Sequence, residues 1–342
     1  MKQTYYIGLI IVLILLNSGC VHDYPTLTAD GEEGIDPTLV EVNTDVTLDL
    51  ELVPLEIMTD NTRSGTTKAA TDYRRRFIIE AWRNGRAEAR QVTVMQDAEE
   101  ENGKKITLPI KLKLHAVEYT LVVWTDYVAA DKESDLYYDT GDLQQVACTE
   151  PYQGSTDFRD CLYGTKPLDL RAYRDEWNAK VQIEIELVRP LAKYEIIATD
   201  VKDFLRKTKK RRADGNDNYT ITFSYGFYLP TVFNALTGKP ADSQTGVQYT
   251  TPLTVPDDGR EECSLGTDFV FVNGTESFVV LTMEIRDETG EVISRTTGLQ
   301  VPYRRGHLTT VRARFLTNEM QGGVDIDPGY DGDIDVDLDK LH

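Results

Sequence analysis

The sequence has few of the residues on which most enzyme and metal sites depend. Its 342 residues include only four histidines and four cysteines. No CxxC pair and no cysteine–histidine cluster has the spacing of zinc ligands. A G-x-S-x-G nucleophile motif and an H-E-x-x-H metal motif are also missing. A catalytic triad would have to use His115 or His307, and neither has a nucleophile motif nearby. We therefore predict that the protein is not an enzyme and has no cofactor.

Positive charge is scarce as well. The chain has 37 basic residues against 57 acidic ones, a formal net charge of −20. Such a surface repels phosphate backbones, which excludes nucleic acid as a partner. The basic run at residues 206–212 is interpreted as a solvated loop or helix end, with contact to an acidic partner as the alternative. A hydrophobic content of 40% is that of a globular chain, and the length suggests about two domains.

Only one long apolar run is present, at residues 5–16, and it follows Lys2. About a dozen apolar residues are too few for a transmembrane helix and are typical of a secretory signal. Small residues follow the run, ahead of Cys20. This ending resembles a bacterial lipobox, although Asn17 stands where leucine is usual. The resemblance implies a signal peptide at residues 1–19 and a mature chain that begins at a lipid-modified Cys20.

Export leaves three cysteines in an oxidising compartment: Cys148, Cys161 and Cys263. Three cysteines cannot all pair within one chain. A bridge between Cys148 and Cys161 would close a short loop, and buried or free thiols are the alternative. The sequence leaves both possibilities open.

Alternation of apolar and polar residues is the main structural signal. It predicts half-buried strands at residues 46–52, 106–115 and 181–187, the second at a sheet edge because of Pro109. Further strands are expected at residues 76–83, 117–124, 192–198, 221–227 and 301–316. Asn273-Gly274 predicts a hairpin between its flanking apolar runs. Asp200 is expected to cap a short helix at residues 200–212.

These elements predict an all-β protein with two β-sandwich domains in series. The expected domains are residues 45–170, with long loops over 130–170, and residues 171–342. Residues 20–44 are polar and are interpreted as a tether.

The C-terminus carries a further amphipathic pattern. Ile334, Val336 and Leu338 alternate with aspartates, which predicts a strand at residues 333–339. Seven aspartates lie between Asp325 and Asp339, which raises the alternative of a calcium site. Neither register of an EF-hand loop fits, so the solvated face of a strand is favoured and no metal is predicted.

Tyrosines gather in the irregular segment before residue 170. Tyr137 and Tyr138, with Tyr152 and Tyr163 nearby, are candidates for a platform on which a glycan stacks. The alternative is that these rings cover the edge of a sandwich.

Several stretches resemble exported lipoproteins of Bacteroidales, and most of them resemble the fimbrillin superfamily of those bacteria. The tether resembles the former. The latter resemblance rests on Arg189-Pro190-Leu191-Ala192-Lys193-Tyr194, on Tyr228-Leu229-Pro230 with Phe233-Asn234, on residues 301–311 (VPYRRGHLTTV) and on residues 327–333 (DPGYDGD).

The resemblance implies a type V pilus component, built from two transthyretin-like β-sandwiches and lipid-anchored at the outer-membrane surface. In that family a protease removes the first strand of a stalk subunit after an arginine, and a terminal strand of the neighbour fills the groove. Arg63 is the candidate cleavage point, with Arg74, Arg75 and Arg76 as rivals. Anchor subunits keep their first strand and their lipid.

The expected donor residues are Ile334, Val336 and Leu338. The tail that carries them has the alternative of pairing within its own domain. The implied partners are other fimbrial subunits, the outer membrane through the lipid, and a host or glycan ligand for adhesion. An anchor or accessory subunit is favoured, and a glycan-binding surface lipoprotein is the alternative function.

Overall fold

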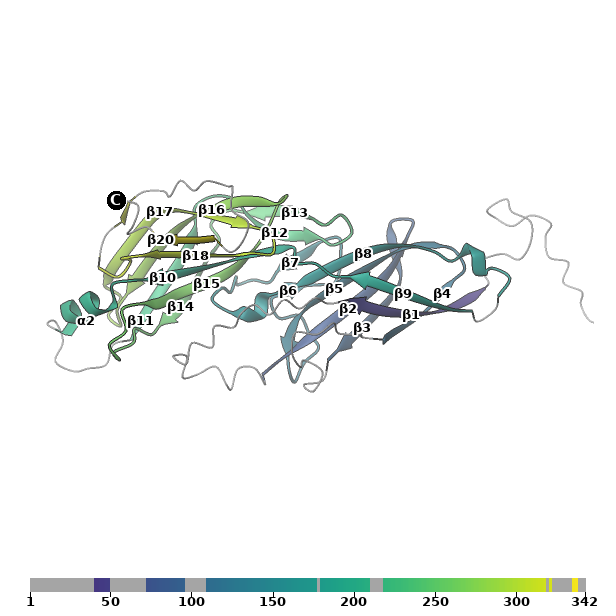
Figure 1. Cartoon of the computed structure of the whole chain (residues 1–342), viewed down its shortest axis with the longest axis horizontal. Helices are drawn as coiled ribbons and strands as arrows, with labels where there is room; N and C mark the ends of the chain where they lie inside the picture. The colour runs from purple at the N-terminus through teal and green to yellow at the C-terminus, as the bar shows by residue number, and fades with distance from the viewer. Residues whose placement is uncertain are drawn as a thin grey trace, which may run out of the picture.

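The structure is a computed structural model, and it describes residues 40–49, 72–95, 109–176, 179–209, 218–317, 320–321 and 334–337. Strands dominate, and they build two β-sandwiches that lie end to end (Figure 1). The predicted all-β architecture of two sandwiches in series is confirmed. The expected leader and most of the expected tether lie outside the described residues. β1 begins at Glu41, four residues before the expected start of the first domain.

The first sandwich consists of a four-stranded and a three-stranded sheet. In sheet order, the larger contains β3 (Arg86–Val94), β2 (Tyr73–Arg83), β5 (Glu118–Ala129) and β8 (Leu162–Asp169). The smaller contains β4 (Pro109–His115), β1 (Glu41–Asp49) and β9 (Lys180–Glu186). β4 is an edge strand, as Pro109 predicts, because proline cannot donate to a second neighbour.

Two expectations for this region are corrected. Residues 162–169 were expected to be loop, but they form β8 and pair with β5 along its length. β9 was assigned to the second domain, but it pairs in parallel with β1 in the first sandwich. A division at residue 170 would therefore separate β9 from its partner. Alternation within β9 identifies a half-buried strand, whereas the choice of partner depends on the rest of the fold.

The second sandwich also consists of two sheets. One contains, in order, β15 (Cys263–Phe271), β10 (Leu191–Ala198), β18 (Leu308–Ala313) and β20 (Ile334–Asp337). The other contains β14 (Gln248–Leu253), β11 (Tyr219–Tyr225), β16 (Glu276–Arg286), β17 (Val292–Arg304) and β19 (Met320–Gln321). In β11 the side chains of Ile221, Phe223 and Tyr225 are buried, as their alternation predicts. Phe227 was expected to join them, but it lies beyond the strand and is exposed.

The predicted hairpin at Asn273-Gly274 is wrong. A turn is present, with Gly274 at φ 89°, but it carries the chain from β15 in one sheet to β16 in the other. β15 pairs with β10 instead. Its two faces are both buried, since Val270 lies in the core of the second sandwich and Phe269 and Phe271 lie in the junction described next. A two-residue hairpin does occur at Asn84-Gly85, between β2 and β3, where both residues have positive φ.

A fifth sheet connects the two sandwiches. It contains β13 (Lys239–Gln244), β12 (Leu229–Asn234), β7 (Val146–Cys148) and β6 (Tyr138–Asp139) in that order. Beneath it lies a separate apolar core in which Ile78 and Trp124 of the first sandwich meet Phe233 and Phe271. The rings of Phe233 and Phe271 stack with centroids 5.2 Å apart. Each fully buried ring contributes about 1.5–3 kcal/mol, so the junction holds the two sandwiches together.

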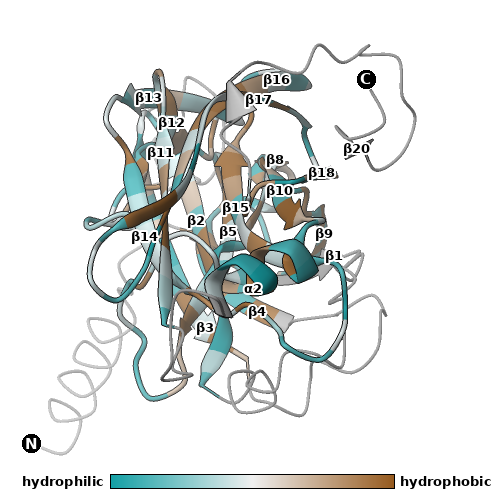
Figure 2. Ribbon diagram, turned by 90° about the vertical axis from the view of Figure 1, so that its left-hand side faces the viewer, coloured by the Kyte–Doolittle hydropathy of each residue, from teal (hydrophilic) through white to brown (hydrophobic). Residues whose placement is uncertain are grey.

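The described chain contains one α-helix, α2 (Val201–Lys209), which lies across the far end of the second sandwich (Figure 2). Val201 and Phe204 bury its apolar face in the core. Asp200 precedes the helix as predicted, but its carboxylate does not bond to the first turn. It accepts hydrogen bonds from the backbone N–H groups of Leu316 and Thr317, at 3.2 and 2.8 Å. Asp200 therefore joins the helix start to the segment after β18.

Candidate functional site

β1 occupies the middle of its sheet. It pairs antiparallel with β4 from Glu41 to Thr47 and parallel with β9 from Asn43 to Asp49. Val42 and Thr44 are fully buried, and the Thr44 hydroxyl donates to the carbonyl oxygen of Leu112 at 3.1 Å. Removal of β1 would leave a slot in the sheet between β4 and β9, and the backbone N–H and C=O groups that face the slot would be unpaired. Such a slot binds an added strand by main-chain hydrogen bonds.

The C-terminal strand β20 has the opposite character, because it lies at a sheet edge. It pairs in parallel with β18 only, from Thr309 opposite Ile334 to Arg312 opposite Asp337. The predicted tail strand is therefore present, and it pairs within its own chain. Ile334 and Val336 lie in β20, whereas Leu338 lies outside the described residues.

The rival cleavage points lie inside the first sandwich. Arg74, Arg75 and Arg76 belong to β2, where each pairs with a residue of β5. The side chains of Arg75 and Arg76 are only 3% and 4% exposed. A trypsin-like protease needs an exposed, extended substrate chain, so the folded protein protects these positions. Arg63 lies outside the described residues, as does Cys20.

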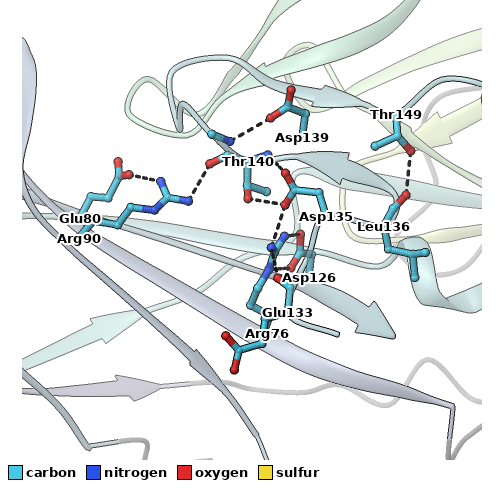
Figure 3. Close-up of polar contacts among 11 residues, drawn as sticks. Arg76, Glu80, Arg90, Asp126, Glu133, Asp135, Leu136, Asp139, Thr140 and Thr149 are labelled. Atoms are coloured by element: carbon cyan, nitrogen blue, oxygen red, sulfur yellow. Dashed lines mark hydrogen bonds and ion pairs between the residues drawn. The ribbon is translucent and has the colours of Figure 1, made fainter. Parts of the chain in front are cut away.

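Arg76 instead anchors the segment that follows β5 (Figure 3). Its guanidinium makes a two-pronged pair with Asp126, Nε to Oδ1 at 2.9 Å and Nη2 to Oδ2 at 2.7 Å. Its Nη1 donates to the Glu133 carbonyl at 3.1 Å and lies 2.8 Å from Asp135 Oδ1. Asp135 in turn accepts from the backbone N–H and the hydroxyl of Thr140. One buried arginine thus holds the first part of this loop against β5.

A second arginine holds the same loop from β3. Arg90 pairs with Glu80 and donates to the carbonyl oxygen of Thr140 at 2.8 Å (Figure 3). At the other end of the loop the Thr149 hydroxyl donates to the Leu136 carbonyl at 2.9 Å. Together these contacts place β6 and β7 at the junction between the sandwiches.

We predict that Asp135→Asn lowers the free energy of unfolding at neutral pH by about 1 kcal/mol, because the Asp135 side chain is one-third exposed and water screens its ion pair. Burial raises the pKa of Asp135, but hydrogen bonds from Thr140 and the charge of Arg76 bring it below its usual value. The stabilisation is therefore present above the unfolded pKa of about 3.9 and is lost as the pH falls through the folded pKa. Denaturation with urea between pH 3 and 7 measures it, and Asp139→Asn is the matched control. A loss that does not depend on pH would contradict the assignment.

The candidate glycan platform at Tyr137 and Tyr138 is not available. These side chains are 7% and 1% exposed, and burial raises the pKa of Tyr137 to about 12. The Tyr138 hydroxyl donates to the carbonyl of Arg159 at 2.6 Å, and its ring meets Trp124 edge-on. A ring that stacks on a sugar must expose one face. These tyrosines instead fill the junction core.

Tyr152 plays a larger structural part than the sequence indicates. It precedes β8 in the chain, yet its ring lies in the core of the second sandwich against Tyr225 and Tyr249. Its hydroxyl donates to Asp268 Oδ2 at 2.8 Å. Nearby, the Ser155 N–H donates to the carbonyl of Thr267 on β15 at 2.7 Å. Residues 152–155 thus close the β15 edge of the second sandwich.

A buried ion pair secures this segment. Arg159 Nη1 lies 2.6 Å from Asp268 Oδ1, and the two side chains are 3% and 0% exposed. Asp268 also accepts from the Tyr225 hydroxyl at 2.6 Å. Arg159 lies over the Tyr152 ring, 4.2 Å from its centroid. No spacing rule connects residues 159 and 268, and the only sequence signal is the single charge of Asp268 immediately before an apolar run.

The cysteines and histidines form no reactive site in the described part of the chain. Cys148, Cys161 and Cys263 are free thiols, so the alternative of a bridge between Cys148 and Cys161 does not apply. Burial raises the pKa of Cys148 to about 11 and that of Cys263 to about 12, so neither thiolate forms at neutral pH. His115 lies on β4 and His307 lies just before β18, on different sandwiches. Within the described ranges no three potential metal ligands meet.

Among the described residues, no helix is long and apolar enough to cross a membrane.

Comparison with known proteins gives a family and a set of similar structures. A family model described as "Family of unknown function (DUF6562)" matches residues 37–340. No curated protein matches the chain. Among solved structures, the fimbrial anchor protein Mfa2 of Porphyromonas gingivalis matches at a TM-score of 0.36 and 14% identity, over 75% of this chain and 82% of that one.

Two other solved structures show a similar degree of likeness. A fimbrial assembly protein of Parabacteroides distasonis matches at a TM-score of 0.34 and 12% identity, over 80% of this chain and 91% of that one. A protein of Bacteroides ovatus matches at 0.39 and 12%, over 75% of both chains. Structures of Bacteroidales fimbrial proteins, the class that the sequence stretches resemble, are thus among those similar to this chain.

Proposed function

The chain belongs to the DUF6562 family of unknown function, and we propose that it is a surface-exposed fimbrial lipoprotein, an anchor or accessory subunit. In this proposal Cys20 carries the lipid that holds the chain at the outer membrane. Neighbouring subunits join by exchange of a β-strand, and the assembly supports adhesion.

One observation carries the strand-exchange proposal: five residues of the tail match the last five residues of β1 at four positions. Residues 45–49 read DVTLD and residues 335–339 read DVDLD, so the two segments differ at one position of five. The first segment lies in β1, where it pairs with β4 and β9. A chain with the same alternation fits the same slot, because register in a sheet follows the inward-facing side chains.

The positions of the two strands favour movement of the tail in one direction. β20 makes backbone hydrogen bonds to a neighbouring strand on one side only. A strand in the β1 slot makes them to β4 on one side and to β9 on the other. Each added backbone hydrogen bond contributes about 0.5–1.5 kcal/mol. A tail that leaves its own β18 and enters the slot of a neighbour therefore gains a second ladder. The slot must first be empty, which a cut in the link between β1 and β2 allows.

The state of the N-terminus distinguishes the two roles. An anchor keeps β1 and a lipid on Cys20, whereas a polymerising subunit loses β1 after cleavage at Arg63. Intact-mass and N-terminal analysis of protein from its own cells measures this directly. A lipidated chain that begins at Cys20 supports the anchor or accessory role. A chain that begins at Ser64 assigns the protein to the stalk. An unlipidated chain cut at another position would contradict both the anchor role and the stalk role.

Cys20→Ala is expected to release the protein from membranes. An acyl chain contributes about 0.8 kcal/mol for each buried CH₂, and that contribution is lost without the cysteine. Fractionation into membrane and soluble pools measures the change, with Cys263→Ala as the control that keeps the lipid. Continued extraction by detergent alone would disprove lipid anchoring.

A further inference from the structure

The most exposed large apolar side chains of the described chain gather at one end of a sheet. Phe227 is 66% exposed and Tyr228 is 76% exposed, in the connection between β11 and β12. Phe278, on the outer face of β16, is 50% exposed. The N–H of Gly226 donates to the carbonyl of Val280 at 2.8 Å, which ties the connection to β16 two residues from Phe278. Exposed aromatic groups of this kind indicate a binding surface.

The sheet face next to these rings has no charge. One cross-strand row consists of Gln248, Ser224 and Thr282, which are paired positions on β14, β11 and β16. The next rows along β16 and β17 place Val280 beside Gln300 and Phe278 beside Pro302. Charged residues resume only beyond these rows, where Glu284 pairs with Arg286 and Glu276 stands opposite Arg304. In a chain with 27% charged residues, this is an unusual surface.

Packing on the opposite side of the same strands keeps this face rigid. The intervening side chains Tyr225, Leu281 and Leu299 point into the core of the second sandwich and are 5% exposed or less. A Cβ added at Gly226 would lie 3.3 Å from Val280, so glycine lets the connection run close to β16 at this point. A preorganised face loses little entropy when it binds an extended ligand.

We propose that this face, from Ser224 and Gln248 to Phe227, Tyr228 and Phe278, binds a neutral polysaccharide chain. A pyranose ring has one apolar C–H face and a rim of hydroxyl groups. Exposed aromatic rings stack on the first, while amide and hydroxyl side chains both donate to and accept from the second. Neighbouring strands are about 4.8 Å apart, comparable to the length of a sugar ring. The site supplies the adhesive part of the proposed function but needs no subunit assembly.

Other occupants fit the surface less well. These rows contain no cationic side chain that could pair with an acidic polysaccharide, and the net charge of −20 repels such a ligand. Two copies of this chain, each with that charge, repel one another when these faces meet. A lipid surface would favour a net basic rim around the aromatic groups. Here the bordering Arg286 and Arg304 stand beside Glu284 and Glu276.

The test uses the full chain with three neutral polysaccharides (a β-glucan, a mannan and amylopectin) and one acidic polysaccharide. Affinity electrophoresis detects binding and titration calorimetry gives its strength. We expect at least one neutral chain to bind, and Tyr228→Ala and Phe278→Ala each to weaken it about tenfold. Tyr228→Phe keeps the ring and is expected to retain most of the affinity. Both side chains are exposed, so thermal unfolding of the variants should match that of the wild type.

Val92→Ala is the matched control, because Val92 is exposed at 40% on β3 of the first sandwich. Its affinity should equal that of the wild type. A chain that lacks residues 329–342 should also bind, which separates this inference from strand exchange. Failure of every neutral polysaccharide to bind, equal loss in Val92→Ala, or binding only to an acidic polysaccharide would overturn the proposal. Reversible self-association that Tyr228→Ala abolishes, without glycan binding, would assign the face to a second copy instead.

Discussion

Arg159→Met is expected to lower the free energy of unfolding by about 3–5 kcal/mol, because it leaves Asp268 charged and unpaired in the interior. The two side chains are almost fully buried and 2.6 Å apart. After the substitution Asp268 keeps hydrogen bonds from Tyr152, Tyr225 and its neighbour's backbone N–H, but no cation remains beside it. Equilibrium denaturation with guanidinium chloride measures the loss.

The loss should depend on pH. Burial raises the pKa of Asp268, although Arg159 and two tyrosine hydroxyls oppose the rise. Without Arg159 the pKa rises further, so the folded variant takes up this proton at a higher pH than the wild type does. A folded pKa above the unfolded one means stability that is present at low pH and is lost as the pH rises. The destabilisation should therefore be larger at pH 8 than at pH 5.

The control for Arg159→Met is Arg171→Met. Arg171 pairs with Asp169 at 2.8 Å, but both side chains are about half exposed. Its loss is expected to cost less than about 1 kcal/mol. Arg159→Met with Asp268→Leu removes both charges and should recover part of the stability lost in the single variant. Equal, small effects at residues 159 and 171 would mean that the buried pair does not stabilise the fold more than an exposed pair does.

Deleting residues 329–342 is expected to abolish the joining of subunits. The deletion removes β20 and the DVDLD segment that matches the last five residues of β1 at four positions. The folded subunit should survive, because β20 is an edge strand of four residues with one neighbour. Cross-linking of cell-surface assemblies followed by gel electrophoresis measures joining, and thermal unfolding of the isolated subunit verifies its fold.

A pair of point variants sharpens this test. Val336 stands opposite Val311 of β18, and Asp335 stands opposite Thr310. If the alternate apolar residues of the tail fill the neighbour's slot, Val336→Asp should block joining and Asp335→Ser should not. Normal assembly of the truncated chain, or equal effects of the two substitutions, would rule out the tail as donor.

Local pattern predicted most of the strands. The alternation in β9, β11 and β4 identified half-buried strands because side chains on a strand point alternately to opposite faces. Pro109 correctly placed β4 at an edge. β2 and β5 were recognised as apolar segments, although burial of both their faces removes the alternation.

Long-range choices could not be predicted in this way. Asn273-Gly274 specifies a turn, but whether its flanking strands pair depends on β10, which binds β15 instead. The exposure of individual side chains could not be predicted from local sequence either. Tyr137 and Tyr138 lie in a polar segment that resembles a surface loop, yet Arg76 and Arg90 hold this segment over the junction, where the rings are buried.

The sequence by itself therefore determined the all-β class, the two groups of strands, the turns and the amphipathic tail, because each depends on neighbours a few residues away. Tertiary structure alone decided that β9 belongs to the first sandwich, that residues 152–155 close the second, and that Arg159 meets Asp268 across 109 residues of chain. It also decided which aromatic rings stay exposed. Pairing, burial and charge compensation depend on distant segments, whose approach is governed by the summed packing of both sandwiches.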